Sequence, residues 1–415
     1  MDIKDRIKLL DCEKEVTGLA SELIGIPSVN PPGDMRDIAA YIRDYLTGLG
    51  LSVSWVEPEP GCVSLVSRIK GGDGPTLIFN GHMDVVPIGD RDRWSWDPFG
   101  GEIRDGYLLG RGASDMKGGL AAMLVALSKI AASGPLSGDL VFMAVPDEET
   151  GGRMGTRYLL EQEPLGDACI IGEPSGLNPT IGQKGSLWLE AVASGVPAHG
   201  SLSPLAGDNA ILKMEEVVRI IYSLWETEWP LPDHARSLID LTASILKEEN
   251  QTLPVEVLGR VTTNIGLIHG GEKINIIPSR CRAEFDLRIP IGLPVEHVLK
   301  ELQARIQQRF PEGVTVTPKA PPFEANYTEP DHPFVLKVLS AITEVAGVPS
   351  RPTLQWASSD ARYFRYRSIP TVQYGPADLG GIHGYDERVR VASLVEAVRV
   401  YSLLAYDFLG SPRKG

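Results

Sequence analysis

The chain has 415 residues, of which 43% are apolar and 23% are charged. This length exceeds that of one ordinary core and predicts two domains, and the composition is that of a folded globular protein. A formal net charge of −14 disfavours nucleic acids and anionic membranes as partners. No apolar run approaches the roughly 20 residues that a membrane-spanning helix needs. The charged N-terminus lacks the pattern of a secretory signal, so we expect a cytoplasmic protein.

The first part of the chain alternates short apolar runs with helical segments. Buried strands are predicted at residues 76–79, 139–145 and 168–171. Between the first two, residues 116–132 are rich in Ala and Leu with helical spacing. Each predicted strand is followed by polar residues and glycine. This alternation is typical of an α/β domain with a parallel sheet.

The pattern changes near residue 186. Residues 186–194 alternate like a half-buried strand, residues 209–225 form an amphipathic helix, and long strands are predicted at 261–269 and 280–289. In the last of these, apolar and charged residues alternate strictly, which predicts a sheet with one packed face and one polar face. A helix at 295–309 and a strand at 314–317 complete an α+β unit.

The α/β pattern resumes after the proline-rich stretch 318–322, with predicted helices at 333–346, 359–366 and 392–408 and a strand at 371–374. We therefore predict a discontinuous α/β domain, formed by residues 1–184 and 320–415. A smaller α+β domain, residues 185–319, interrupts it.

Polar residues cluster where the predicted strands end, and this is where ligands bind in open α/β sheets. These clusters contain His82 and Asp84, Ser114 and Asp115, Asp147 with Glu148 and Glu149, and Glu173, and a fifth cluster near the C-terminus contains His383. So many carboxylates at one edge would repel one another, and divalent cations would remove the repulsion. Imidazole and carboxylate ligands suit two Zn²⁺ ions, with Co²⁺ or Mn²⁺ as substitutes.

Four motifs carry a resemblance to a known family: GHMDVVP at 81–87, GRGASDMKGG at 110–119, DEETG at 147–151 and GEPS at 172–175. In order and spacing they resemble the zinc-dependent amidohydrolases and peptidases that include acetylornithine deacetylase, succinyl-diaminopimelate desuccinylase, aminoacylase and glutamate carboxypeptidase. The resemblance implies hydrolysis of an amide bond in N-acyl-L-amino acids by a hydroxide that bridges two metals. It also implies that the inserted domain is a lid and that it joins two subunits in a homodimer.

The resemblance assigns the metal ligands residue by residue. His82, Asp115 and Glu173 would bind one metal ion. Asp115 would be shared, and Glu149 and His383 would complete the second site. The family also has a cis peptide bond after the shared aspartate, which implies one after Asp115 here.

Two carboxylates beside the metals have further implied roles. Glu148 would be the general base, which takes a proton from the attacking water and passes it to the leaving amine. Asp84 would orient the imidazole of His82. Adjacent side chains on a strand point to opposite sides, so Glu148 and Glu149 require a loop, which the following Gly151-Gly152 favours.

The inserted domain contributes three more candidates through the resemblance. His199 matches the lid histidine, which donates to the developing oxyanion and commonly comes from the partner subunit. Asn275 and Arg288 match substrate-binding positions, and the guanidinium of Arg288 suits a substrate carboxylate. We expect strand 186–194 to leave an open edge for dimerisation.

Other classes of function fit less well. A non-catalytic small-molecule or scaffold protein on this fold would be expected to lose the base or a ligand, and here all are present. A phosphate-binding loop would need Gly-Lys-Ser/Thr, a serine hydrolase its nucleophile elbow, and a zinc-helix protease His-Glu-x-x-His. The sequence contains none of these.

The substrate is less well determined than the chemistry. Desuccinylases of the family usually have paired arginines where this chain has Gln183 before Lys184, and a tyrosine where it has Leu202. This departure disfavours a succinyl group and favours a neutral or apolar acyl group. Acetylornithine, other N-acyl amino acids and dipeptides all remain open as substrates, so a dipeptidase or carboxypeptidase is an alternative.

Overall fold

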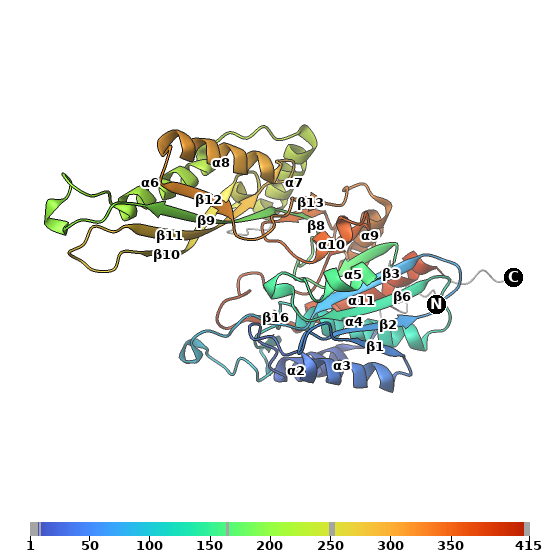
Figure 1. The fold of residues 1–415 in the computed structure, drawn as a ribbon. Helices are drawn as coiled ribbons and strands as arrows, with labels where there is room; N and C mark the ends of the chain where they lie inside the picture. Colours follow the sequence, from blue (N-terminus) through green and yellow to red (C-terminus); the bar gives the residue numbers. More distant parts are fainter. Residues whose placement is uncertain (1–6, 8–9, 163–165, 249–253, 411–415) are drawn as a thin grey trace. The chain divides into compact units, whose positions relative to one another are not determined.

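A computed structural model describes residues 7, 10–162, 166–248 and 254–410. The chain forms two compact units (Figure 1). The first comprises Met1–Ile181, Thr328–Thr353 and Ser359–Gly415, and the second comprises Gly182–Tyr327 and Leu354–Ser358. The first is α/β with a mixed sheet and the second has a separate antiparallel sheet, so the predicted fold class is confirmed. No helix in the described ranges is long and apolar enough to cross a membrane.

The first unit is built around strands β1-β2-β6-β3-β7-β15 of a mixed sheet, whose order continues as β8-β13. The strands of this sheet are β1 (Val53–Val56), β2 (Ser64–Ile69), β3 (Thr76–His82), β6 (Asp139–Val145), β7 (Ala168–Ile171), β8 (Thr180–Gln183), β13 (Asn326–Tyr327) and β15 (Thr371–Gln373), with β14 (Thr353–Gln355) paired to β8. The unit boundary runs through β8 and β14 and follows β13. Strands β6, β3, β7 and β15 are parallel, so their carboxyl ends meet at one edge.

Helices cover both faces of this sheet (Figure 1). Apolar residues of β3, β6 and β7 pack on one face against α5 (Thr156–Gln162) and α10 (Ala361–Arg365). The strands also pack against α4 (Lys117–Ala132) and α11 (Val391–Leu409), where the ring of Phe79 lies 5.6 Å from that of Tyr401. The remaining helices are α2 (Glu13–Gly25), α3 (Arg36–Gly48) and α9 (Pro333–Ala346). Because both faces are covered, β3 and β6 are apolar along most of their length, as the sequence predicts.

A small sheet of order β16-β5-β4 lies beside this core. Its strands are β4 (Ile103–Arg104), β5 (Tyr107–Leu109) and β16 (Arg388–Arg390), and a short 3-10 helix, η1 (Arg91–Arg93), precedes them. The pairing of β16 with β5 places the segment before residue 388 next to the segment after residue 109. These two segments carry His383 and Asp115.

The second unit has a four-stranded antiparallel sheet of order β10-β11-β9-β12. Its elements are β9 (Gly185–Ser194), α6 (Ala210–Tyr222), α7 (Asp233–Glu248), β10 (Thr262–Gly270), β11 (Arg280–Ile289), α8 (Val295–Arg309) and β12 (Val314–Pro318), with short 3-10 helices at Gly200–Leu202, Ser223–Glu226 and Val255–Leu258. Alternate residues of β9 and β11 are buried in a core with α6 and α8, as the alternating sequence predicts.

The predicted open edge at residues 186–194 is wrong. Strand β9 is paired on both sides, with β11 and with β12, so the edge strands of this sheet are β10 and β12. Alternation of apolar residues identifies which face of a strand is buried but not which neighbours it has.

Candidate metal centre

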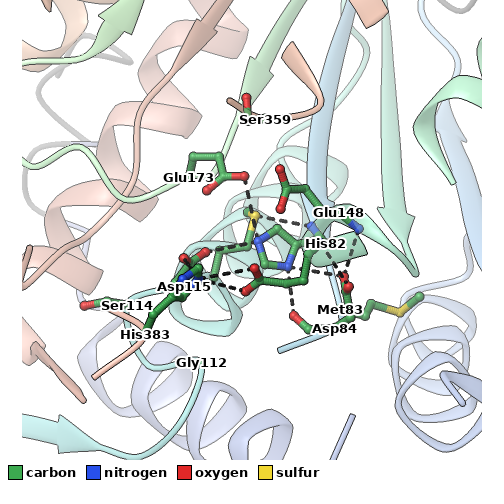
Figure 2. Close-up of polar contacts among 12 residues, drawn as sticks. His82, Met83, Asp84, Gly112, Ser114, Asp115, Glu148, Glu173, Ser359 and His383 are labelled. Carbon is green, nitrogen blue, oxygen red and sulfur yellow. Dashed lines mark hydrogen bonds and ion pairs between the residues drawn. The ribbon is translucent and has the colours of Figure 1, made fainter. Parts of the chain in front are cut away.

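The candidate site lies where the parallel strands end. Strand β3 ends at His82, β6 ends two residues before Asp147 and its neighbouring glutamates, and β7 ends two residues before Glu173. The imidazole of His82 lies among the side chains of Asp115, Glu148 and Glu173 (Figure 2). The edge of the sheet therefore gathers residues that are far apart in the sequence.

Asp115 is the centre of the cluster because it contacts both histidines. Its Oδ1 lies 3.1 Å from Nε2 of His82, and its Oδ2 lies 3.2 Å from Nε2 of His383. Nε2 of His383 is also 3.2 Å from the carboxylate of Glu149, and Nε2 of His82 is 3.7 Å from Oε1 of Glu173. The two oxygens of the Asp115 carboxylate thus contact two different histidines.

The donor atoms are close enough to share metal ions. Those of His82, Glu148 and Glu173 all lie within 4.8 Å of one another, and so do those of His82, Asp115 and Glu149. Imidazole nitrogen and carboxylate oxygen are the ligands that zinc and related metals take.

The cluster also holds more negative charge than a buried site tolerates. Oε1 of Glu173 is buried with no hydrogen-bond partner among the described residues. Burial, and then the charge of Asp115, raise the pKa of Glu173 to about 8, and burial likewise raises the pKa of Glu148 and of Glu149. Hydrogen bonds to Asp115 and Glu149 raise the pKa of His383 to about 10. Divalent cations would balance this charge, so the donors fit a metal centre.

Asp84 contacts both the histidine and the turn that follows β6. Its backbone carbonyl lies 2.8 Å from Nδ1 of His82, and its carboxylate lies 3.5 Å from the same nitrogen. The carboxylate accepts hydrogen bonds from the backbone N–H groups of Glu148 (3.2 Å) and Glu149 (3.1 Å) and from the side chain of Asn30 (3.0 Å). Asp84 therefore fixes the imidazole with its main chain and the two glutamates with its side chain.

Glu148 and Glu149 both reach the donor cluster because they lie in a turn rather than a strand. Residues Glu148–Thr150 form a 3-10 turn, followed by Gly151 and Gly152 with φ angles of 110° and 63°. A Cβ atom at Gly152 would lie 1.8 Å from a carboxylate oxygen of Asp360. The glycines thus allow both the turn and its close approach to the neighbouring loop.

Asp115 is held in place by a buried carboxylate that we did not predict. Oε1 of Glu387 accepts hydrogen bonds from the backbone N–H groups of Gly112, Ser114 and Asp115, each at 3.1 Å. Its Oε2 accepts a hydrogen bond from Arg111 at 2.6 Å. In the sequence, Glu387 is marked only by its position four residues after His383. That position does not predict a contact with the loop of Asp115.

The start of α4 approaches the Glu173 loop closely. The Asp115–Met116 peptide bond is cis, as predicted. A Cβ atom at Gly119 would lie 2.1 Å from the carbonyl oxygen of Gly172, which precedes Glu173. Only glycine allows this approach, which explains its place in the motif.

The candidates in the second unit lie on two different parts of it. His199 is exposed, with Nδ1 2.7 Å from the hydroxyl of Ser201. Its segment pairs with that of Asn275, because the N–H of Gly200 donates to the carbonyl of Asn275 at 2.9 Å. Arg288 lies apart from them on β11.

Lys184, which follows Gln183, uses its ammonium group in hydrogen bonds within the second unit. Nζ of Lys184 is buried and donates to the carbonyls of Val257 (2.6 Å) and Arg260 (2.8 Å) and to the hydroxyl of Thr262 (3.2 Å). Burial, and then the charge of Arg288, lower the pKa of Lys184 to about 7. Its donors are used within the protein.

A model of peptidase family M20/M25/M40 matches residues 78–407, which include the metal-centre candidates and the second unit. The chain belongs to this family. The matched range includes all four motifs quoted above, so the predicted resemblance is confirmed.

Relatives of this M20/M25/M40 member carry names of deacylases and peptidases. Succinyl-diaminopimelate desuccinylase of Xanthobacter autotrophicus is 32% identical over 92% of this chain and 96% of its own length. Acetylornithine deacetylase of Vibrio campbellii is 30% identical over 87% of this chain and 89% of its own. The M20 family metallo-carboxypeptidase Sso-CP2 of Sulfolobus solfataricus superposes with a TM-score of 0.76 at 20% identity, covering 95% of this chain and 98% of the other.

Proposed function

We propose that this protein is a two-metal hydrolase that cleaves the amide bond of N-acyl-L-amino acids in the cytoplasm. The observation that carries the proposal is the position of Asp115, with one carboxylate oxygen on His82 and the other on His383. A carboxylate in this position is suited to bridge two ions. Relatives named desuccinylase and deacetylase support the reaction class.

His82, Asp115 and Glu173 would hold one ion, and Asp115, Glu149 and His383 the other. Zn²⁺ suits these ligands best, and Co²⁺ or Mn²⁺ would substitute. Bound metal would polarise the amide carbonyl and make water nucleophilic near neutral pH.

Glu148 moves the proton. Its backbone is fixed by Asp84. Its donor atom lies within 4.8 Å of those of His82 and Glu173, and we leave it out of both proposed sets of ligands. A carboxylate held there can take the proton of the attacking water and deliver it to the leaving nitrogen.

The second unit would bind the rest of the substrate. Arg288 would hold the substrate carboxylate, Asn275 would hydrogen-bond to the substrate, and His199 would donate to the oxyanion. Asn275 and His199 lie on paired segments of the second unit.

The acyl group is proposed to be neutral. Lys184 stands where desuccinylases have the second of their paired arginines. Its ammonium group already donates hydrogen bonds to Val257, Arg260 and Thr262. A succinyl carboxylate would therefore find no available cation at that position.

Metal removal and a substrate panel test the proposal. Chelation should abolish hydrolysis, and Zn²⁺ or Co²⁺ should restore it with about two ions bound per chain. N-acetyl-L-amino acids should be cleaved faster than N-succinyl-diaminopimelate, with dipeptides in the same panel. Full activity in a preparation shown by elemental analysis to be free of metal would refute the mechanism. Faster cleavage of dipeptides would replace the deacylase by a dipeptidase.

A further inference from the structure

The polar face of the second unit's sheet carries an exposed indole beside the proposed carboxylate-binding arginine. Trp188 of β9 pairs with Asp286 of β11, and Arg288 follows two residues along β11 on the same face. The neighbours Leu187 and Leu189 point into the core and are fully buried. Trp188 is 48% exposed, so one of the largest apolar side chains faces away from the core.

A single carboxylate holds both side chains. Oδ1 of Asp286 accepts a hydrogen bond from Nε1 of Trp188 at 3.0 Å. Its Oδ2 accepts hydrogen bonds from Nε and Nη2 of Arg288 at 3.1 and 2.9 Å. The orientation of the indole and that of the guanidinium are therefore set together, before any ligand binds.

The arginine retains donors for a ligand. Its Nη1 donates to the hydroxyl of Ser358 at 2.6 Å. With the two hydrogen bonds to Asp286, the described residues use three of the five N–H groups of the guanidinium. The other two can bind one carboxylate.

The two groups are close enough in the sheet for one ligand to contact both. Diagonal neighbours on adjacent strands lie about 7–8 Å apart, within reach of long and aromatic side chains. A ligand whose carboxylate meets Arg288 would therefore place a large side chain near Trp188. Indole packs well against aromatic and apolar groups.

We propose that Trp188, held by Asp286 beside Arg288, selects substrates whose amino-acid part has a large aromatic or apolar side chain. This inference rests on the proposed function, because the carboxylate at Arg288 is taken to be that of the amino acid.

Kinetics with a matched pair of substrates test the selection. We expect kcat/KM for N-acetyl-L-phenylalanine relative to N-acetyl-L-alanine to fall about 10-fold in Trp188→Ala, mainly through KM. Trp188→Phe should keep most of the preference. Trp55→Ala is the matched control, because Trp55 is also exposed (36%) on a strand and donates to a carboxylate, that of Glu57. An unchanged ratio in Trp188→Ala, with both substrates hydrolysed, overturns the inference and leaves the proposed function standing.

A binding measurement separates the subsite from the reaction. 3-Phenylpropanoate and propanoate have the carboxylate but no amide bond, so the enzyme cannot hydrolyse them. We expect the phenyl compound to bind about 10-fold more tightly to the metal-loaded wild type and to Trp55→Ala, but not to Trp188→Ala. If the binding preference is found but the enzyme hydrolyses no amide, the subsite is supported and the proposed function is refuted. Equal binding of the two acids to the wild type overturns the subsite.

Discussion

Single residues of the candidate metal centre could be proposed from the sequence because each falls within a motif that fixes its residue type and spacing. His82 follows Gly81 at the end of an apolar run, and Glu173 follows Gly172 in the same way. Glu387 and Asn30 could not be predicted, because their roles are hydrogen bonds to loops that lie far away in the sequence. A buried carboxylate outside such a motif, with partners far away in the sequence, leaves no local pattern.

Replacing Glu148 by Gln tests the division of roles between the two adjacent glutamates. The substitution keeps the volume and removes the proton acceptor, so we expect kcat to fall about 10²–10⁴-fold. Metal content should stay unchanged, because Glu148 is not in the proposed ligand sets. The control is Glu149→Gln, which should lose a metal ion. If Glu148→Gln loses a metal and Glu149→Gln keeps both, the two roles are reversed.

At the scale of elements, buried strands and amphipathic helices were predictable, and their neighbours were not. The predicted bounds of β6, β7, β11 and α8 are those observed, because burial on one or both faces leaves a clear period in the sequence. Helices α2 and α3 were missed, and so was α7, although apolar residues line one side of each. The segment of α7 follows a Pro- and Trp-containing stretch that we did not assign.

Loops were the least predictable elements, and the loop that carries Asp115 depends on another loop. Glu387 accepts three backbone hydrogen bonds from this loop and pairs with Arg111. Residues that orient metal ligands contribute about 10–100-fold to metal affinity. We therefore expect Glu387→Gln to weaken metal binding by this factor, measured by competition with a chromophoric chelator.

A control distinguishes this effect from the loss of an ion pair elsewhere in the first unit. Asp139, at the opposite end of β6, accepts a backbone hydrogen bond from Gly71 and one from Arg68. Asp139→Asn removes a similar pair away from the metal centre and should leave the affinity for metal unchanged. Equal metal affinity in Glu387→Gln and the wild type, with both folded by circular dichroism, would mean that Glu387 only stabilises the loop.

At the scale of the whole molecule, the sequence predicted an interrupted α/β domain but not all of the segments that make up the second unit. Residues Leu354–Ser358 cluster with the second unit, although they lie between two parts of the first. The backbone N–H of Leu354 donates to the hydroxyl of Thr242 on α7, and Ser358 accepts from Arg288. Contacts of this kind join residues more than a hundred positions apart or cross several elements, and they leave no local pattern.

We propose that the second unit joins two copies of the chain in a homodimer. Strand β10 lies at the edge of its sheet, and Leu267 and Ile268 on it are about half exposed. An apolar edge strand tends to pair with another strand, and a two-fold interface is the commonest solution. His199, in the same unit, is exposed and belongs to neither group of metal donors.

Mixing two inactive variants tests whether His199 acts on the partner's site. In a heterodimer of Glu148→Gln with His199→Ala, action across the interface leaves one site doubly damaged and the other intact. Action within the subunit damages both sites. We therefore expect co-expression to restore about a quarter of wild-type activity if subunits pair at random, well above either variant alone. Each variant co-expressed with itself is the control. Heterodimers confirmed by native mass spectrometry but without activity would show that His199 serves its own subunit.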